Sequence, residues 1–286
     1  MRRIVAMIAD THGGHKLALC NPATRWEDED AEGNRTWSGP TLTRTQEWLW
    51  SRYTEHMGQA LEFAAGDNVT LIHNGDITWG VKYPEQLVSS RIDVQPTIGY
   101  YNLLPWLEQE NVKTVRLIHG TPSHEFGMGS SNRSIAAMFN MGFQDKSVAS
   151  SRHLLADVSG VTFDVAHHGP SAGIRVWTAG NQFRYNLRSI MLADMLNGRR
   201  PPRVVARAHY HTYQHETVRI QTDQGEVASE ILMIPGYCGF SHYTVQATRS
   251  AYLMQCGVVC AEIIDGAFSR IVPFTDALDI RTKEDL

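Results

Sequence analysis

Five short runs of apolar and β-branched residues recur between residues 3 and 209, separated by longer and more polar stretches. Near-continuous apolar runs of this length are typical of strands that are buried on both faces. Each run ends at, or shortly before, a polar residue that can bind a metal ion. The runs, each given with that residue, are Arg3–Ala9 with Asp10, Val69–Gly75 with Asp76, Val115–Gly120 with His124, Val161–Ala166 with His167, and Arg203–Ala208 with His209.

Helical patterns lie between these runs. Residues Arg44–Ala65, Ile98–Gln109 and Asn181–Leu196 carry apolar side chains at the spacing of one helix face. Thr43, followed three residues later by a glutamine, predicts a capping box at the start of the first helix, and Pro105 is expected to kink or divide the second. Strands that alternate with helices predict a layered α/β fold, in which the carboxyl ends of the strands line the ligand crevice. The five strand ends are therefore expected to converge on one site.

Two stretches depart from this pattern. Residues 20–43 are polar and rich in acidic residues, glycine and proline, which predicts an excursion over the surface that acts as a lid or contact loop. From about residue 217 the runs become shorter and are separated by turns, which predicts an antiparallel sheet that completes the domain. A length of 286 residues suits a single domain that spans the whole chain.

Composition narrows the class of protein. Contents of 42% hydrophobic and 20% charged residues are those of an ordinary soluble globular protein. No apolar run approaches the length of about 18 residues that a membrane span needs, and the N-terminal run is too short for a signal peptide. The four cysteines form no CxxC pair and are expected to be free thiols of a cytoplasmic protein. A net charge of −4 argues against a partner such as long nucleic acid, but allows a small phosphorylated substrate, because bound metal ions supply positive charge locally.

The strand-end residues offer donors suited to divalent metal ions. Asp10 and His12 are two residues apart in an extended segment, so both can reach one ion, and His209 and His211 repeat this spacing. The carboxylate of Asp76 follows a glycine that permits a tight turn, and its two oxygens can bridge two cations. Nitrogen and oxygen donors without a thiolate favour manganese, iron, zinc or a similar divalent ion over a structural cysteine-rich zinc site.

Taken singly, each of these motifs is commonly a turn or a surface feature, and their joint occurrence carries the prediction. The ordered series Asp-x-His, Gly-Asp, a Gly-to-His-Glu segment, a strand-end His and His-x-His resembles the calcineurin-like metallophosphoesterase superfamily over residues 3–215. The loop Gly120–His124 is similar to that of phage- or prophage-borne members, which implies the host cytoplasm as location. The resemblance implies a layered sandwich of two mixed β-sheets flanked by helices. It also implies hydrolysis of phosphate esters with two divalent ions, manganese being favoured and iron, zinc, nickel or magnesium being alternatives.

The resemblance further implies a role for each matching residue. The first ion would be held by Asp10, His12 and His211 and the second by His167 and His209, with Asp76 bridging the two. A hydroxide shared by the ions would attack phosphorus. His124 would face the substrate without binding metal, and would stabilise the charge or protonate the leaving oxygen.

The sequence departs from the family pattern next to the second ion. Thr121 stands where family members usually place an asparagine ligand, which leaves this ion with a hydroxyl or with water. His167 is favoured over His168 as the ligand because it ends the apolar run, and His168 would then lie in the surroundings of the ion or contact the substrate. Arg207 and Tyr210 are candidate phosphate contacts.

Three functions are compatible with these residues. The leading hypothesis is a phosphodiesterase that acts on a small or nucleotide-like diester, because the acidic chain shows no basic stripe of the kind that grips long DNA. The alternatives within the enzyme class are a phosphomonoesterase or protein phosphatase, and a nuclease. A different class would be a catalytically degenerate binding protein that metal stabilises, since Thr121 alters one motif.

Overall fold

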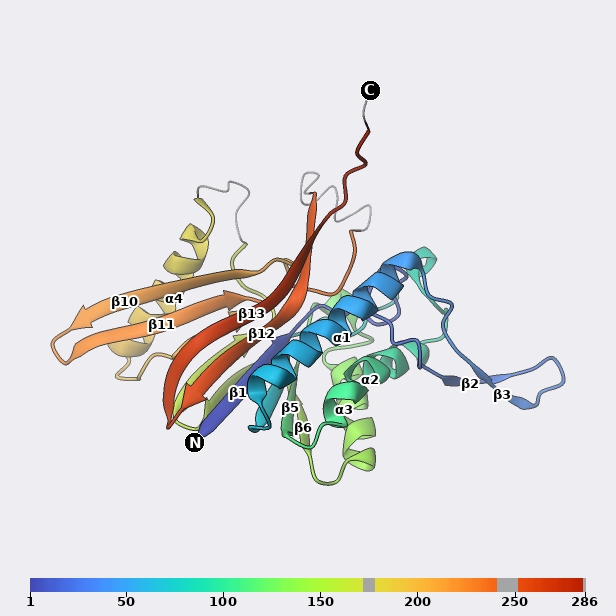
Figure 1. Ribbon diagram of the computed structural model, residues 1–286, viewed down its shortest axis with the longest axis horizontal. Helices are drawn as coiled ribbons and strands as arrows, with labels where there is room; N and C mark the ends of the chain where they lie inside the picture. The colour runs from blue at the N-terminus through green and yellow to red at the C-terminus, as the bar shows by residue number, and fades with distance from the viewer. Residues whose placement is uncertain (172–177, 241–251, 285–286) are drawn as a thin grey trace.

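The computed structural model describes residues 1–171, 178–240 and 252–284, and two β-sheets form its centre (Figure 1). The larger sheet has six strands in the order β13-β12-β1-β4-β5-β6. These strands are β1 (Arg2–Ile8), β4 (Val69–His73), β5 (Val112–Ile118), β6 (Ser147–Ser151), β12 (Leu253–Ile264) and β13 (Ala267–Asp279). The strands β1, β4, β5 and β6 run parallel, whereas β12 is antiparallel to both β1 and β13.

The smaller sheet has five strands in the order β10-β11-β9-β8-β7. They are β7 (His153–Val158), β8 (Val161–Ala166), β9 (Val204–Arg207), β10 (Gln214–Thr222) and β11 (Gly225–Met233). Its three central strands are parallel, and β7 and β10 pair antiparallel at the two edges. Both sheets are therefore mixed, and the predicted α/β fold of two mixed sheets flanked by helices is confirmed.

Strand β1 of the larger sheet is buried on both faces, as its apolar run predicts. Val5 and Met7 of β1 point toward the smaller sheet and pack in one cluster with Phe163 of β8. Ile4 and Ile8 point the other way and belong to the core under the helices. Because side chains alternate along a strand, a run that is apolar at every position must be covered on both sides.

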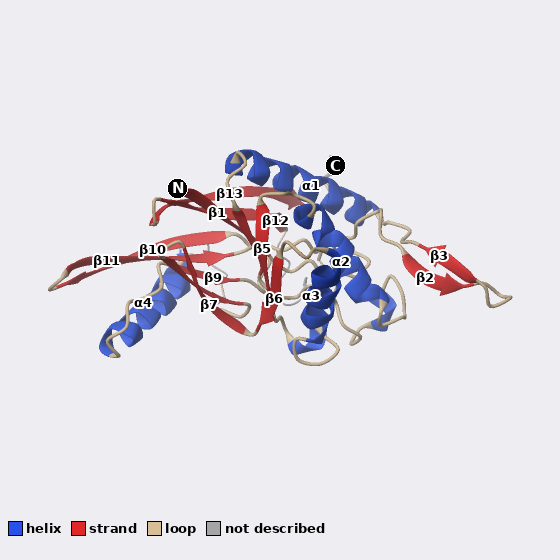
Figure 2. Cartoon of the chain, turned by 90° about the horizontal axis from the view of Figure 1, so that it is seen from below, coloured by secondary structure: helices blue, strands red, loops and turns tan. Residues whose placement is uncertain are grey.

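Helices cover the outer faces of the two sheets (Figure 2). The helices are α1 (Arg44–Ala64), α2 (Val94–Leu107), α3 (Ser130–Gly142) and α4 (Asn181–Leu196), with the short 3-10 helices η1 (Pro84–Gln86) and η2 (Pro122–His124). The first three pack on the larger sheet, and α4 packs on the smaller one, where Phe183 and Leu187 contact the cluster that contains Val205. Within the described ranges, no helix is long and apolar enough to cross a membrane.

The helix boundaries differ from expectation in one informative place. The predicted capping box at Thr43 is present. However, α2 begins at Val94 rather than at residue 98, and Pro105 lies in its last turn without dividing it. Proline cannot donate a backbone hydrogen bond, which frees the carbonyl of Tyr101 four residues earlier. That carbonyl accepts a hydrogen bond of 2.7 Å from the Asn21 side chain, so the missing bond is replaced.

The polar stretch 20–43 forms a hairpin that projects from the body, made of β2 (Trp26–Glu29) and β3 (Arg35–Ser38) (Figures 1 and 2). Trp26 packs against Cys20 and Val94, which ties the base of the hairpin to α2. Trp37 on β3 is 72% exposed.

The C-terminal strands do not form the separate antiparallel sheet that the sequence predicts. Strands β10 and β11 complete the smaller sheet, while β12 and β13 join the larger sheet beside β1. The reason lies in β12, whose residues are buried on both faces: Val258 belongs to the core under the helices and Val259 to the core between the sheets. Such a strand needs a position inside a layered core rather than in a sheet with one solvated face.

Candidate metal centre

The ends of β1 and β4 bring the first candidate ligands together. Asp10 and His12 follow β1, and Asp76 follows β4, its parallel neighbour. The two segments stay hydrogen-bonded beyond the strands, since the backbone N–H groups of Asp10 and His12 donate to the carbonyls of Gly75 and Asp76. All three side chains are buried. The parallel register of two neighbouring strands thus places two carboxylates and one imidazole at the same edge.

Backbone strain is concentrated at these positions. Eight non-glycine residues of the described ranges have a positive φ angle, which costs free energy for a residue with a Cβ atom. Three of them occupy common sites for it: Ala65 ends α1, and Ser159 and Asp265 lie in hairpin turns before a glycine. The other five are Asp10, His12, Asp76, His209 and His211. Strain at five predicted ligands indicates a functional site, because sparsely populated backbone conformations cluster at active sites and ligand-binding sites.

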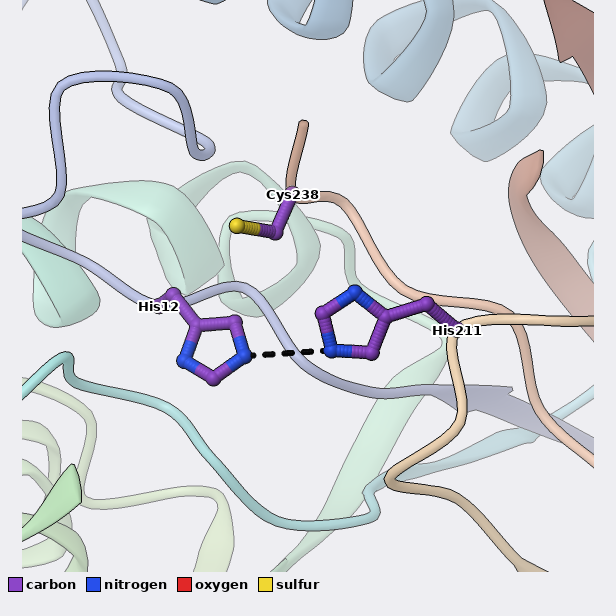
Figure 3. Close-up of side chains that lie close together, drawn as sticks. All are labelled: His12, His211 and Cys238. Carbon is purple, nitrogen blue, oxygen red and sulfur yellow. Dashed lines mark hydrogen bonds between the residues drawn. The ribbon is translucent and has the colours of Figure 1, made fainter. Parts of the chain in front are cut away.

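The first group of donors surrounds Asp10. Its Oδ1 atom lies 3.3 Å from Nε2 of His211 and 3.8 Å from Nε2 of His12. The two imidazoles also face each other, with 3.3 Å between their Nε2 atoms (Figure 3). Residues from the two sheets of the fold therefore direct three donor atoms at one another.

The second group surrounds Asp76. Its Oδ2 atom lies 3.0 Å from Nε2 of His167 and 3.9 Å from Nδ1 of His209. Its Oδ1 atom accepts a hydrogen bond of 2.5 Å from the backbone N–H of Thr121. Nδ1 of His167 lies 2.8 Å from the carbonyl of Asn74, to which it donates, so Nε2 is the nitrogen that faces Asp76. Asp76 stands between the two groups, since Asp10, Asp76 and His167 have donor atoms within 4.8 Å of one another.

The structure thus brings together all six residues predicted as metal ligands, and it adds the two left open. The residues that meet at this edge are Asp10, His12, Asp76, Thr121, His167, His168, His209 and His211. His168 lies with Nε2 3.3 Å from the hydroxyl of Thr121. Which of them bind an ion stays a prediction.

The donor atoms fit divalent ions. Oδ1 of Asp10 and Nε2 of His167 are buried and make no hydrogen bond of acceptable geometry, although Nε2 of His167 lies only 3.0 Å from Asp76. Buried polar atoms are normally paired, and an unpaired one costs roughly 1–3 kcal/mol. Unpaired atoms that converge from separate strands, with nitrogen and oxygen in the set, are what a metal site requires.

Charge at the centre favours cations. Burial alone would raise the pKa of Asp10, but the positive charges of His211 and His167 lower it to about 2. Burial likewise opposes the charged form of Asp76, and His167 more than offsets this, so its pKa is far below the usual range. In turn, the two carboxylates outweigh the effect of burial on His167 and raise its pKa to about 9. The buried carboxylates demand positive charge, which protons or divalent ions can supply.

His124 lies at the edge of the centre on η2. Its Nδ1 atom is 2.8 Å from the carbonyl of Trp79, to which it donates, so Nε2 points at Asp76 from 3.9 Å. The indole of Trp79 packs against the rings of His124, His12 and His15, with centroids 4.7, 5.1 and 4.2 Å apart. Trp79 therefore holds two site histidines in place. Sequence reasoning missed it because an aromatic residue three positions after Gly-Asp carries no metal-binding signal.

The two candidate phosphate contacts differ in position. Arg207 is buried, and its Nη1 atom lies 2.7 Å from Oδ1 of Asp164 and donates to the carbonyls of Asp164 and Ala206. Tyr210 is 42% exposed and packs its ring edge-on against His209. The guanidinium of Arg207 is thus engaged within the protein, while Tyr210 lies at the surface beside the centre. Contact of either residue with a substrate stays a prediction.

A thiol lies next to the first group, although the sequence indicated a site without sulfur. Cys238 is buried and has its sulfur within 4.8 Å of a ring nitrogen of His12 and one of His211 (Figure 3). Its sulfur also lies 3.4 Å from the carbonyl of Gly239, and burial raises the pKa of the thiol. The segment that carries it packs tightly on the centre, because a Cβ atom on Gly236 would lie 2.8 Å from that of Asp10. No motif near Cys238 revealed this proximity in the sequence.

Fold and site define an α/β protein of two mixed sheets whose buried aspartate and histidine clusters are suited to metal ions. Neither a protein-family model nor a curated protein matches the sequence. Among solved structures, the chain is similar to a hypothetical protein from Thermus thermophilus, with 12% identity and a TM-score of 0.40 over 97% of this chain and 99% of that one.

Proposed function

We propose that this protein is a metal-dependent phosphoesterase, and that it acts on small or nucleotide-like phosphodiesters. The observation that supports the proposal most is the convergence of five strained, strand-end residues on one buried cluster of carboxylates and imidazoles. The residues that meet in this cluster belong to the ordered motifs that resemble those of the metallophosphoesterases. Two-metal hydrolysis of phosphate esters is the chemistry that such a donor set serves.

The residues fit two neighbouring ions. Asp10, His12 and His211 would hold the first, and His167 and His209 the second, with Asp76 between them. Bound divalent ions would supply Lewis acidity, which activates water and neutralises charge on a phosphoryl group. Imidazole and carboxylate donors accept manganese, iron, zinc or nickel.

The chain's own groups then complete the reaction. Nδ1 of His124 is committed to the Trp79 carbonyl, so Nε2 can hold a proton at the edge of the cluster and transfer it to the leaving oxygen. The backbone N–H of Thr121 fixes Oδ1 of Asp76, which leaves Oδ2 directed at His167 and the shared space. Positioning of this kind lowers the barrier because the groups need no rearrangement during the reaction.

A diester is favoured over a monoester by the charges beside the centre. A monoester dianion needs more positive charge near the phosphoryl oxygens than a diester does. Arg207 lies two residues before His209 in the sequence. Its guanidinium is paired with Asp164 instead of being free to bind a substrate. The acidic net charge also disfavours a long nucleic acid as partner.

A panel of chromogenic esters tests this proposal. Metal-stripped protein is incubated with manganese, cobalt, nickel, zinc or magnesium and with bis-(p-nitrophenyl) phosphate, p-nitrophenyl phosphate and cyclic nucleotides. Faster turnover of diesters, absent in an Asp76→Asn variant, is the expected result. Faster turnover of the monoester would establish the phosphatase alternative. Binding of metal without hydrolysis of any ester would support the alternative of a binding protein. That alternative follows from Thr121, which stands where the family usually has an asparagine ligand.

A further inference from the structure

Two adjacent histidines at the end of β8 turn toward the same point. Successive side chains of a strand point to opposite faces, but β8 ends at Ala166 and the chain bends at His167. The rings of His167 and His168 meet edge to face with centroids 4.9 Å apart. Together with His209, each offers a ring nitrogen within 4.8 Å of the other two. The two histidines are therefore neighbours around one point and not alternatives for it.

The hydroxyl of Thr121 lies at this point. Its Oγ1 atom is 3.2 Å from Oδ2 of Asp76, 3.3 Å from Nε2 of His168 and 3.3 Å from Nδ1 of His209. A hydroxyl has one hydrogen and two lone pairs, so Thr121 can donate to Asp76 and accept from the two imidazoles, or share a cation with these three groups. Bonds of about 2.0–2.2 Å from a four- or five-coordinate ion place its ligand atoms roughly 2.8–3.8 Å apart. The observed separations are close to that spacing, so a shared cation would satisfy the three groups together.

We infer that His168 and the hydroxyl of Thr121 complete the second ion position, which then has three imidazoles, one carboxylate and one hydroxyl. This inference rests on the metal-dependent function proposed above. It adds which kinds of metal ion the second position would bind. Imidazole-rich donor sets suit zinc, cobalt, nickel or ferrous iron and disfavour magnesium. His168 is exposed whereas His12 of the first position is buried, so this ion lies on the solvent side and exchanges before the first.

The loop that carries His168 packs against the side chain of Arg207. A Cβ atom on Gly169 would lie 2.7 Å from Cγ of Arg207, so the loop rests directly on that side chain. The ion pair of Arg207 with Asp164 fixes the arginine in turn. The side chain of Arg207 therefore packs against the backbone next to His168.

Nitrogen NMR of the unaltered protein tests the inference directly. Protein labelled with ¹⁵N-histidine is titrated with Zn²⁺, and the side-chain nitrogens are followed in long-range ¹H–¹⁵N spectra. Nε2 of His168 is expected to move to the value of a metal-bound imidazole when the second equivalent binds. A signal that keeps the value of a free imidazole with two ions bound overturns the inference.

A substitution supplies the second test. The variant His168→Phe keeps a ring of similar size, and the control is His215→Gln on β10, which keeps a side-chain donor for Glu230. Two Co²⁺ ions are expected to bind the wild type and the control, measured by competition with a chelating dye. The His168 variant should bind the first ion equally and the second at least roughly 10- to 100-fold more weakly. Equal affinity for the second ion in all three proteins contradicts the inference.

These measurements separate the inference from the proposed function. Neither requires ester hydrolysis, so a metal-bound His168 in a protein without phosphoesterase activity would refute only the reaction. Conversely, an active enzyme in which the His168→Phe variant retains its second ion would refute only the role of His168.

Discussion

Nε2 of His12 lies 3.3 Å from Nε2 of His211, although 199 positions separate the two residues in the chain. Both Nδ1 atoms are buried and have no hydrogen-bond partner. Two imidazoles in contact through the same nitrogen can share at most one proton there, so the pair alone leaves polar groups unsatisfied. Oδ1 of Asp10 beside them adds a negative charge to this space. A divalent cation would accept the lone pairs of both Nε2 atoms and balance the carboxylate, while the two Nδ1 atoms would keep their protons.

Removal of metal should therefore destabilise the protein. An ion present at about 100 times its dissociation constant adds roughly 2.7 kcal/mol to stability, which corresponds to a rise in Tm of roughly 4–5 °C for a chain of 286 residues. We expect the Tm of protein saturated with Mn²⁺ or Zn²⁺ to fall by this amount after treatment with EDTA, as measured by scanning calorimetry. The variant Asp76→Asn should show little of this difference, because the shared carboxylate is neutralised. An unchanged Tm after chelation in the wild type would argue against a metal centre.

Loss of His124 should reduce turnover and leave the metal ions in place. Its Nε2 atom lies 3.9 Å from Asp76, and its other nitrogen is anchored to Trp79, so it borders the cluster. General acid catalysis contributes typically 10²- to 10⁴-fold to a rate, and His124→Ala is expected to lose about this factor in kcat. Metal content after dialysis should stay that of the wild type. Ser123→Ala in the same 3-10 helix is the matched control, and equal kcat in both variants would remove the assigned role.

Parts of this centre were predictable because strand ends in a layered fold face one crevice. Asp10, Asp76, His167 and His209 follow four buried strands, and their positions at the ends of these strands predicted that they would meet. Loops have no repeating pattern in the sequence from which their paths could be predicted. Cys238 reaches the site through a tight segment with no motif of its own, so its proximity could not be foreseen.

The fold was likewise predictable where periodicity was strong. The helix Arg44–Ala64 and its capping box matched expectation, since a long amphipathic pattern and its cap are encoded locally. The partners of β12 were wrongly assigned, because a buried run of residues does not reveal which sheet it joins. Sheet membership is a long-range property of the chain, and β1 lies some 250 positions away in register with β12.

Gly120 should tolerate no side chain. A Cβ atom there would overlap both Oδ1 and the backbone nitrogen of Asp76, the residue between the two proposed ion positions. Gly120→Ala is therefore expected to push Thr121 and Asp76 apart and to weaken metal binding at least roughly 10-fold, measured by calorimetric titration. The control is Gly58→Ala in the interior of α1, where a Cβ atom meets nothing within 4 Å. That variant should bind metal normally and gain roughly 0.5–1 kcal/mol in stability. Equal metal affinity in both variants would contradict the close approach.

Acid should weaken the smaller sheet through Glu230. Burial alone would raise the pKa of this carboxyl, but hydrogen bonds from His215, Thr217 and Arg203 lower it from 4.5 to about 2. A carboxyl with a depressed pKa stabilises the fold fully above its unfolded value and loses this contribution as the pH falls from about 4.5 to about 2. The contribution at neutral pH is on the order of 2–3 kcal/mol, since the side chain is almost completely buried.

The variant Glu230→Gln should therefore unfold in urea with a free energy lower by this amount at pH 7, and the difference from wild type should shrink toward pH 3. Comparison with the wild type cancels the acid sensitivity of the carboxylates at the candidate metal centre, which both proteins share. Glu226→Gln is the matched control on the same strand, because its ion pair with Arg219 is exposed and should contribute less than roughly 1 kcal/mol. A difference between Glu230→Gln and wild type that stays constant from pH 7 to pH 3 would show that the charge of Glu230 contributes nothing, and that the loss comes from packing alone.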